Sequence, residues 1–228
     1  MNEAMEYLRE SAKILEQQVE AYGTERNKID LGNGYLIISD TYAEMDHGQE
    51  QQKAYLLKCQ ELWEEMISED MSERVKQKLA LIYEKLADWY LEQKQMSEVI
   101  AFYQKANKLL EEIVTDNKST YNIRNLMFNY VDLGVSYETS DLERYRMDAI
   151  DCYQKGIELL IYERKEELFY AKLGYTYRNL DNLLFQLGGA RNRQEASRLA
   201  WECYQIFERL LQEEDSDQRY KDFLSACS

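Results

Sequence analysis

The chain has 228 residues, no proline, nine glycines and a formal net charge of −15. Nucleic acids and anionic lipids are bound through basic surfaces, so this charge argues against both as partners. The simplest role of the charge is solubility. Hydrophobic residues make up 45% of the chain, enough for a core, and the lack of proline favours an all-α fold.

The N-terminal residues, the lack of a long apolar run and the spacing of the cysteines together predict a cytoplasmic protein. The N-terminus is acidic and no apolar run approaches about 18 residues, so neither a signal peptide nor a membrane span is expected. The cysteines lack metal-ligand or redox spacing and are expected to be small buried hydrophobes in a reducing compartment. They are Cys59, Cys152, Cys203 and Cys227.

The first predicted helix covers residues 2–21. Its apolar residues alternate in steps of four and three, which places them on one stripe. A free coiled coil shows the same spacing, but three heptads are at its lower limit. The spacing of Ala4, Leu8 and Ser11 recurs in Val99, Tyr103 and Ala106. We therefore interpret the first helix as the second helix of an incomplete repeat, which acts as a cap.

A first helical hairpin follows the break at Gly23 and Thr24. Its first helix, called helix A in every hairpin, runs to about residue 46. Gly32 and Gly34 each weaken it by roughly 1 kcal/mol relative to alanine, so a late or irregular start is expected. His47 and Gly48 form the turn. Helix B covers about 49–68, with the predicted apolar set Ala54, Leu57, Leu62, Trp63 and Met66.

Three further hairpins are predicted at about 71–115, 119–163 and 165–213. A capping box, Ser140-x-x-Glu143, is expected to open helix B of the third hairpin. In the fourth, Gly188-Gly189 ends helix A and Asn192-x-x-Glu195 caps helix B. A short last helix has Tyr220, Phe223 and Leu224 on one side, and is either a cap or the start of another repeat.

The hairpins are copies of one repeat. Leucine recurs at 31, 79, 126 and 173, and tyrosine at 35, 83, 130 and 177, in steps of 48, 47 and 47 residues. A fixed period in this range is typical of a stacked supersecondary unit. We divide a single repeat domain, 1–228, into an N-terminal cap (2–24), four repeats (25–69, 70–116, 117–164, 165–213) and a C-terminal cap (214–228).

The second and third repeats resemble the tetratricopeptide (TPR) consensus, in which aromatic residues, leucine and small residues recur at fixed offsets. The matching residues are Tyr83, Leu86, Ala87, Tyr90, Val99, Tyr103 and Ala106, then Tyr130, Leu133, Gly134, Tyr137, Ala149, Tyr153 and Gly156. The resemblance covers about residues 30–210. It implies an all-α right-handed superhelix (α-solenoid) of antiparallel hairpins with capping helices, in which Gly134 and Ala149 mark a close helix approach.

The chain departs from the TPR pattern in three places. The repeats of 47–48 residues exceed the usual 34. Asp181 stands where a small residue belongs. In the first helix B, Lys58 and Glu61 are expected to replace the aromatic and the small residue.

The sequence offers little for catalysis. His47 is the single histidine and falls at a predicted turn, so nucleophile–histidine pairs depend on it alone. Glu44-x-x-His47 has the spacing of half a di-iron site, but no second copy exists. Gly32-x-Gly34 lacks the third glycine of a dinucleotide loop, and no Walker A motif occurs. We expect a protein that is not an enzyme and has no cofactor or metal.

The resemblance implies a protein- or peptide-binding scaffold whose helices A line a groove. The alternatives are a sensor or regulatory module of a larger bacterial signalling or defence protein, and a cytosolic peptide receptor. The expected partner is a protein or peptide segment with Lys or Arg toward one end and apolar anchors toward the other, unless the groove acids serve only solubility; oligomeric state stays open. The groove residues are Asp40, Glu44, Glu84, Asp88, Glu92, Phe128, Val131, Val135, Glu138, Tyr175, Arg178, Asn182 and Phe185.

Overall fold

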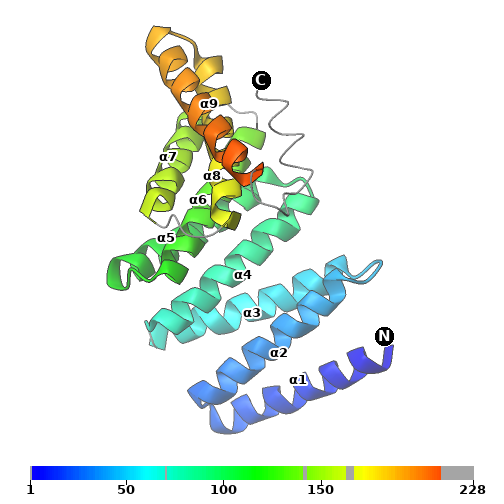
Figure 1. Ribbon diagram of the computed structural model, residues 1–228. Coiled ribbons are helices and arrows are strands. Elements are labelled where there is room, and N and C mark those ends of the chain that lie inside the picture. The colour runs from blue at the N-terminus through cyan, green and yellow to red at the C-terminus, as the bar shows by residue number, and fades with distance from the viewer. Residues whose placement is uncertain (1, 70, 141–142, 163–166, 212–228) are drawn as a thin grey trace. The chain divides into compact units, whose positions relative to one another are not determined.

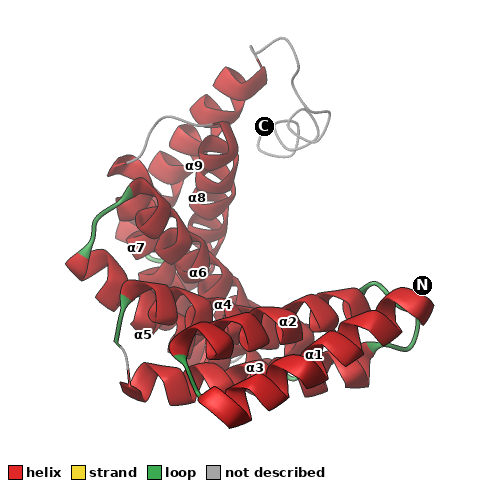
Figure 2. Cartoon of the chain, turned by 90° about the horizontal axis from the view of Figure 1, so that it is seen from below, coloured by secondary structure: helices red, strands yellow, loops and turns green. Residues whose placement is uncertain are grey.

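The computed structural model describes residues 2–69, 71–140, 143–162 and 167–211. Within these ranges the chain forms nine α-helices and one short 3-10 helix, and no strand (Figures 1 and 2). None of the described helices combines the length and apolarity that a membrane span needs. The predicted all-α helical repeat is confirmed.

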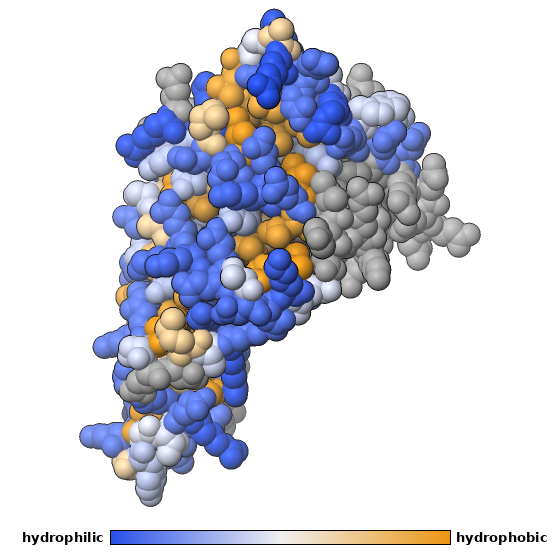
Figure 3. Space-filling view, turned by 90° about the vertical axis from the view of Figure 1, so that its left-hand side faces the viewer, coloured by the Kyte–Doolittle hydropathy of each residue, from blue (hydrophilic) through white to orange (hydrophobic). Residues whose placement is uncertain are grey.

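The chain divides into two compact units, unit 1 (Met1–Ile113) and unit 2 (Val114–Ser228). Unit 1 holds α1 (Asn2–Tyr22), α2 (Glu25–Ala43), α3 (Gln49–Glu69), α4 (Glu73–Glu92) and most of α5 (Met96–Asp116). Unit 2 holds α6 (Thr120–Thr139), the 3-10 helix η1 (Glu143–Tyr145), α7 (Arg146–Tyr162), α8 (Glu167–Leu187) and α9 (Ala190–Leu211). The face seen in Figure 3 is mostly hydrophilic, as the high charge requires.

The repeat tyrosines occupy matching places in the helices A. Tyr35, Tyr83, Tyr130 and Tyr177 lie in α2, α4, α6 and α8 and are 6%, 7%, 8% and 6% exposed. Similar caps precede two of these helices. The hydroxyls of Thr24 and Ser119 each accept a hydrogen bond from the backbone N–H three residues later, at 3.2 Å. The period seen in the sequence therefore governs both local structure and burial.

In unit 1 each repeat tyrosine ties its hairpin to the preceding helix B. The hydroxyl of Tyr35 donates to Glu16 of α1 at 2.6 Å, and that of Tyr83 to Glu64 of α3 at 2.7 Å. Burial first, and then the carboxylate, raises the pKa of both tyrosines, which keeps them protonated as donors. The position of α1 relative to α2 is thus that of a helix B. A glutamate stands nineteen residues before the tyrosine in every repeat, at Glu16, Glu64, Glu111 and Glu158.

Glu16 also accepts a hydrogen bond from the ammonium group of Lys58 at 3.0 Å. Burial alone raises the pKa of Glu16, but the hydrogen bonds from Tyr35 and Lys58 and the nearby lysine charges outweigh burial and lower it. A carboxylate whose pKa falls on folding stabilises the folded state above its unfolded-state pKa. That stabilisation is lost as the pH drops through the folded-state pKa.

Glu16→Gln is therefore expected to reduce stability at neutral pH and to flatten the loss of stability below about pH 5. Urea unfolding at a series of pH values measures both effects. Glu20→Gln, at an exposed position of the same helix, is the control. A Glu16→Gln variant with the wild-type pH dependence would show that this carboxylate contributes no folding-linked protonation.

Two glycines of the helices A leave room for large side chains of the helices B. A Cβ atom at Gly32 would lie 2.6 Å from Nε1 of Trp63, and one at Gly134 2.7 Å from Cε1 of Tyr153. Trp63 and Tyr153 are 1% and 0% exposed. The side chain nearest Gly134 is thus Tyr153 rather than Ala149, which is buried one turn earlier on α7. The expected irregular start of the first helix A is wrong, because α2 is continuous from Glu25 to Ala43.

The predicted register of the first helix B is also wrong, by two residues. Ala54 and Leu57 are exposed, whereas Leu56 and Cys59 are 0% exposed. Leu56 and Cys59 therefore hold the positions of the aromatic and the small residue, one repeat before Tyr103 and Ala106. The Cys59 thiol donates to the carbonyl oxygen of Gly32 at 3.6 Å, and burial raises its pKa to about 12. This cysteine acts as a small hydrophobe.

Two predicted helix starts differ from the structure. Ser140 ends α6 instead of opening the next helix, since its backbone N–H bonds to the carbonyls of Glu138 and Ser136. Asn192 lies inside α9, which begins at Ala190. Gly188 and Gly189 do follow the end of α8, with φ of +67° and +84°. The predicted cap at 214–228 lies outside the described residues.

Candidate functional site

Groups suited to catalysis are isolated in the described part of the chain. His47 lies in the turn after α2, is exposed and has φ of +69°. Cys59 and Cys152 are buried. Among the described residues, no group of three or more His, Cys, Asp or Glu side chains is placed to hold a metal ion. The sites that remain to be considered are the exposed faces of the helices A.

His47→Asn is expected to leave folding and binding unchanged. The imidazole is exposed, and asparagine tolerates the positive φ at this position better than alanine does. Thermal melting and any binding assay established for the wild type would measure this. Loss of a measured turnover in the variant would show that the protein is an enzyme.

In unit 1, acidic side chains recur on the helices A. Asp40 and Asp88 are one repeat apart, as are Glu44 and Glu92, and all four are exposed. Glu84 is half-buried on α4. Asp40 and Asp88 therefore lie at matching positions of α2 and α4, and Glu44 and Glu92 at matching positions at or just after the ends of these helices.

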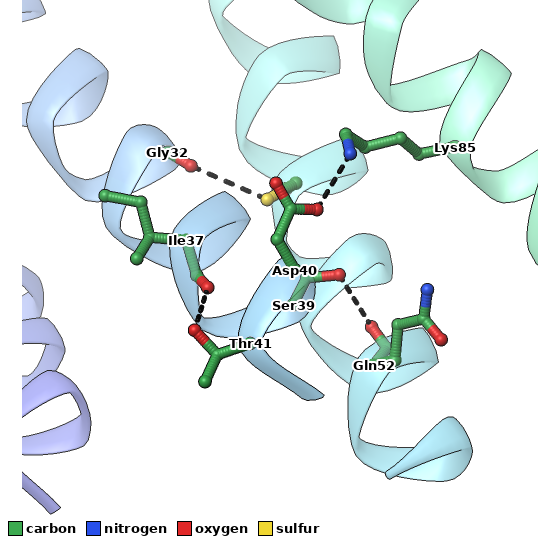
Figure 4. Close-up of polar contacts among 8 residues, drawn as sticks. Gly32, Ile37, Ser39, Asp40, Thr41, Gln52 and Lys85 are labelled. Carbon is green, nitrogen blue, oxygen red and sulfur yellow. Dashed lines mark hydrogen bonds and ion pairs between the residues drawn. The ribbon is translucent and has the colours of Figure 1, made fainter. Parts of the chain in front are cut away.

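An ion pair joins α2 and α4 on this side. Nζ of Lys85 lies 2.8 Å from Oδ1 of Asp40, and Figure 4 shows the two side chains pointing toward each other from their helices. The Asp88 carboxylate accepts a hydrogen bond from the hydroxyl of Tyr103 on α5 at 2.6 Å. Two of the predicted acids thus have partners within unit 1, and Lys85 places a positive charge among them.

Two exposed apolar residues also belong to this side, and the sequence interpretation missed one of them, Ile37. Ile37 on α2 and Leu91 on α4 are 53% and 44% exposed. Lys85 stands one repeat after Ile37, at the equivalent position. Comparing the equivalent positions of the helices A across the repeats would have drawn attention to Ile37. We call Ile37, Asp40, Glu44, Lys85, Asp88, Leu91 and Glu92 the acidic face of unit 1.

In unit 2 the predicted residues of α6 divide into core and surface. Val135 is 39% exposed, and Phe128 is half-buried. Val131 is 3% exposed, and its Cγ2 lies 3.2 Å from the point that a Cβ of Gly156 would occupy. The prediction of Val131 as a groove residue is wrong, because this side chain packs against Gly156 of α7 in the core of the hairpin.

Glu138 belongs to a polar link inside unit 2. Its carboxylate accepts a hydrogen bond from the Tyr153 hydroxyl at 2.8 Å, and that hydroxyl accepts one from Nδ2 of Asn179 at 3.3 Å. Burial, and then the charge of Glu138, raises the pKa of Tyr153. Side chains from α6, α7 and α8 thus meet at one hydroxyl, which gives Glu138 a structural role.

The predicted residues of α8 are mostly exposed. Arg178, Asn182 and Phe185 are exposed, Phe185 at 66%, and Tyr175 is half-buried. With Val135, Phe185 gives unit 2 exposed apolar side chains on two helices A. The aromatic residues of the predicted groove all lie in unit 2, whereas its acids lie in unit 1 except for Glu138.

The chain was compared with known proteins. No protein-family model matches it, and no curated protein matches it significantly in sequence. It is similar in structure to BtubC (BKLC) from P. vanneervenii, at 15% identity and a TM-score of 0.65, over 98% of this chain and 81% of that one. It is also similar to the nuclear import adaptor Nro1 of S. pombe, at 14% identity and a TM-score of 0.68, over 98% and 74%.

A third similar structure is that of a protein with TPR-like repeats. A putative kinesin light chain of Podosopora anserina with TPR-like repeats is 14% identical, with a TM-score of 0.50, over 87% of this chain and 86% of that one. At identities this low, the structural similarity establishes the fold only, and the function has to be argued from the site itself. The chain therefore has a TPR-like helical-repeat fold built from repeats longer than the usual TPR unit.

Proposed function

We propose that this chain is a protein- or peptide-binding scaffold and that the acidic face of unit 1 binds a basic segment with apolar anchors. The observation that supports this proposal is the mixture of side chains on α2 and α4. Carboxylates recur there at equivalent repeat positions beside two exposed aliphatic side chains, Ile37 and Leu91. A face that served solubility alone would gain nothing from exposed aliphatic residues between the acids.

The binding mode follows from the contacts already present. A partner lysine or arginine has access to Glu44 and Glu92, which are exposed. It also competes with Lys85 for Asp40, since that pair is half exposed to solvent, at 31% and 51% of the two side chains. Long-range charge attraction sets the rate of encounter, and burial of Ile37 and Leu91 supplies most of the affinity.

The test exchanges the two exposed glutamates, because Asp40 and Asp88 also hold the fold together. Glu44→Lys with Glu92→Lys is expected to slow association several-fold and to flatten its dependence on salt. The probe is a basic peptide with large apolar residues at one end, selected on the wild type from a library of that design. Stopped-flow fluorescence at several salt concentrations measures the rate.

The matched control is Glu50→Lys with Glu61→Lys on α3, which changes the net charge equally at exposed positions of a helix B. It should lower the rate far less. Equal effects from the two pairs would mean that only total charge matters, and would remove the acidic face as the site.

A further inference from the structure

One side of α1 matches the side of α3 that faces the following helix A. Glu16 of α1 and Glu64 of α3 are one repeat apart, and each accepts a hydrogen bond from a repeat tyrosine. A cation also lies near a tyrosine ring of each following helix A, although from positions one helical turn out of register: the guanidinium carbon of Arg9 lies 5.4 Å from the ring centroid of Tyr42, and Nζ of Lys53 lies 4.8 Å from that of Tyr90. A shift of one repeat therefore aligns α1 with α3 at their glutamate–tyrosine hydrogen bonds.

The opposite side of α3 packs on α2, the helix A of its own hairpin. The ring of Tyr55 lies 5.8 Å from that of Tyr35 and 6.0 Å from that of Tyr42. Cys59 bonds to the backbone of Gly32, and Leu62 is 9% exposed. An aromatic, a small and an aliphatic side chain thus form the seam by which a helix B holds its helix A.

The same three kinds of residue stand one repeat earlier, in α1. They are Tyr7, Ser11 and Ile14. Tyr7 is 72% exposed, Ile14 is 51% exposed, and Ser11 is exposed. No described helix covers this outer face of α1, although α2 covers the equivalent face of α3.

We propose that the outer face of α1 (Tyr7, Ser11 and Ile14) docks an amphipathic helix of a partner protein, in the way that α3 binds α2. The occupant presents apolar residues at helical spacing with a small residue at the crossing point, because the crossing on α3 requires Gly32. Tyr7 is the expected anchor, since tyrosines often dominate binding energy at interfaces.

The charges beside the outer face of α1 indicate the charge of the partner helix. In α3 the position beside the seam is Lys58, whose Nζ lies 5.0 Å from the Tyr35 ring centroid. The matching position in α1 is the exposed acid Glu10, with Glu6 one turn earlier. The docked helix is therefore expected to carry Lys or Arg at its edge. Two α1 helices of different copies would bring these acids together, which disfavours self-association.

The experiment uses a fluorescent peptide of residues 72–93, which is α4 with the residue before it and the residue after it. In unit 1, Phe102 of α5 packs on α4 through Tyr83 and Tyr90, at ring-centroid distances of 6.0 and 5.5 Å. Anisotropy titration with the full chain is expected to show saturable binding. The same peptide with Ala80→Trp, which enlarges the position equivalent to Gly32, should bind at least tenfold more weakly.

Variants of the chain locate the site. Tyr7→Glu with Ile14→Glu is expected to weaken peptide binding at least tenfold, and Ser11→Trp, which adds bulk without charge, should do the same. The control is Tyr121→Glu with Met147→Glu, at positions of unit 2 that are 53% and 64% exposed. It should bind as the wild type does.

Three results would overturn the proposal. They are no saturable binding by the wild-type chain, equal binding by the Tyr7→Glu and Ile14→Glu variant, and dimers in sedimentation that this variant abolishes. The last result would assign the face to a second copy of the chain. All positions changed are exposed, so circular dichroism of each variant should match the wild type.

Discussion

Gly134→Leu is expected to lower the free energy of unfolding by about 2–3 kcal/mol, the cost of overpacking a filled core. Even a single Cβ atom at this position would meet the ring of Tyr153 at 2.7 Å. That ring is 0% exposed, and its hydroxyl is held by Glu138 and Asn179, so it has little freedom to move. The leucine therefore either separates α6 from α7 or breaks the hydroxyl link.

Urea unfolding followed by far-ultraviolet circular dichroism measures this change. Val135→Leu, at a 39% exposed position next along the same helix, is the control and should cost little. Gly134→Ala should also destabilise the protein, and adding Tyr153→Leu to that variant should recover part of its lost stability, because leucine is smaller than tyrosine and leaves room for the new Cβ atom. An unchanged unfolding midpoint for Gly134→Leu would show that α6 and α7 are not in close contact there.

The two glycines of α2 are expected to respond to alanine with opposite signs. A Cβ at Gly32 would lie 2.6 Å from Trp63 Nε1, so Gly32→Ala should destabilise by about 1–3 kcal/mol despite the better helix propensity of alanine. A Cβ at Gly34 would lie 3.4 Å from Leu15 Cδ1, an ordinary contact. Gly34→Ala should therefore stabilise by up to about 1 kcal/mol.

The pair forms its own control, because the same atom is added twice, two residues apart on one helix. Chemical unfolding gives both free energies, and the emission of the buried Trp63 reports the local change in the first variant. Stabilisation by Gly32→Ala would mean that Trp63 does not pack on the backbone of α2.

The period of the repeat was enough to predict the helices and their tyrosines, because regular spacing reflects burial in every copy. The register of α3 could not be found in this way. Cys59 occupies a small-residue position as a buried thiol, while Lys58 and Glu61 beside it matched the expected spacing equally well. Single-sequence patterns distinguish such neighbours poorly, since only packing shows which of them points inward.

The candidate site was harder to predict than the fold. Val131 was expected at the surface because its position on α6 matched a groove position, yet the glycine at 156 on another helix decides its burial. The partners of Asp40 and Asp88 likewise come from other helices, at distances in sequence that no local pattern encodes. The tyrosine–glutamate pairs, by contrast, could have been predicted from the sequence, since their nineteen-residue spacing recurs four times.

Those pairs determine how folding spreads through unit 1. Each hydrogen bond from Tyr35 or Tyr83 reaches back to the helix before its own hairpin, so it forms only when two neighbours are both in place. Such contacts couple adjacent repeats and leave distant ones independent, as in a one-dimensional chain of interacting elements. Fraying of α1 removes the acceptor of Tyr35 and weakens α2 next, whereas α4 keeps Glu64. Opening that begins at α1 is therefore expected to reach α2 before α4.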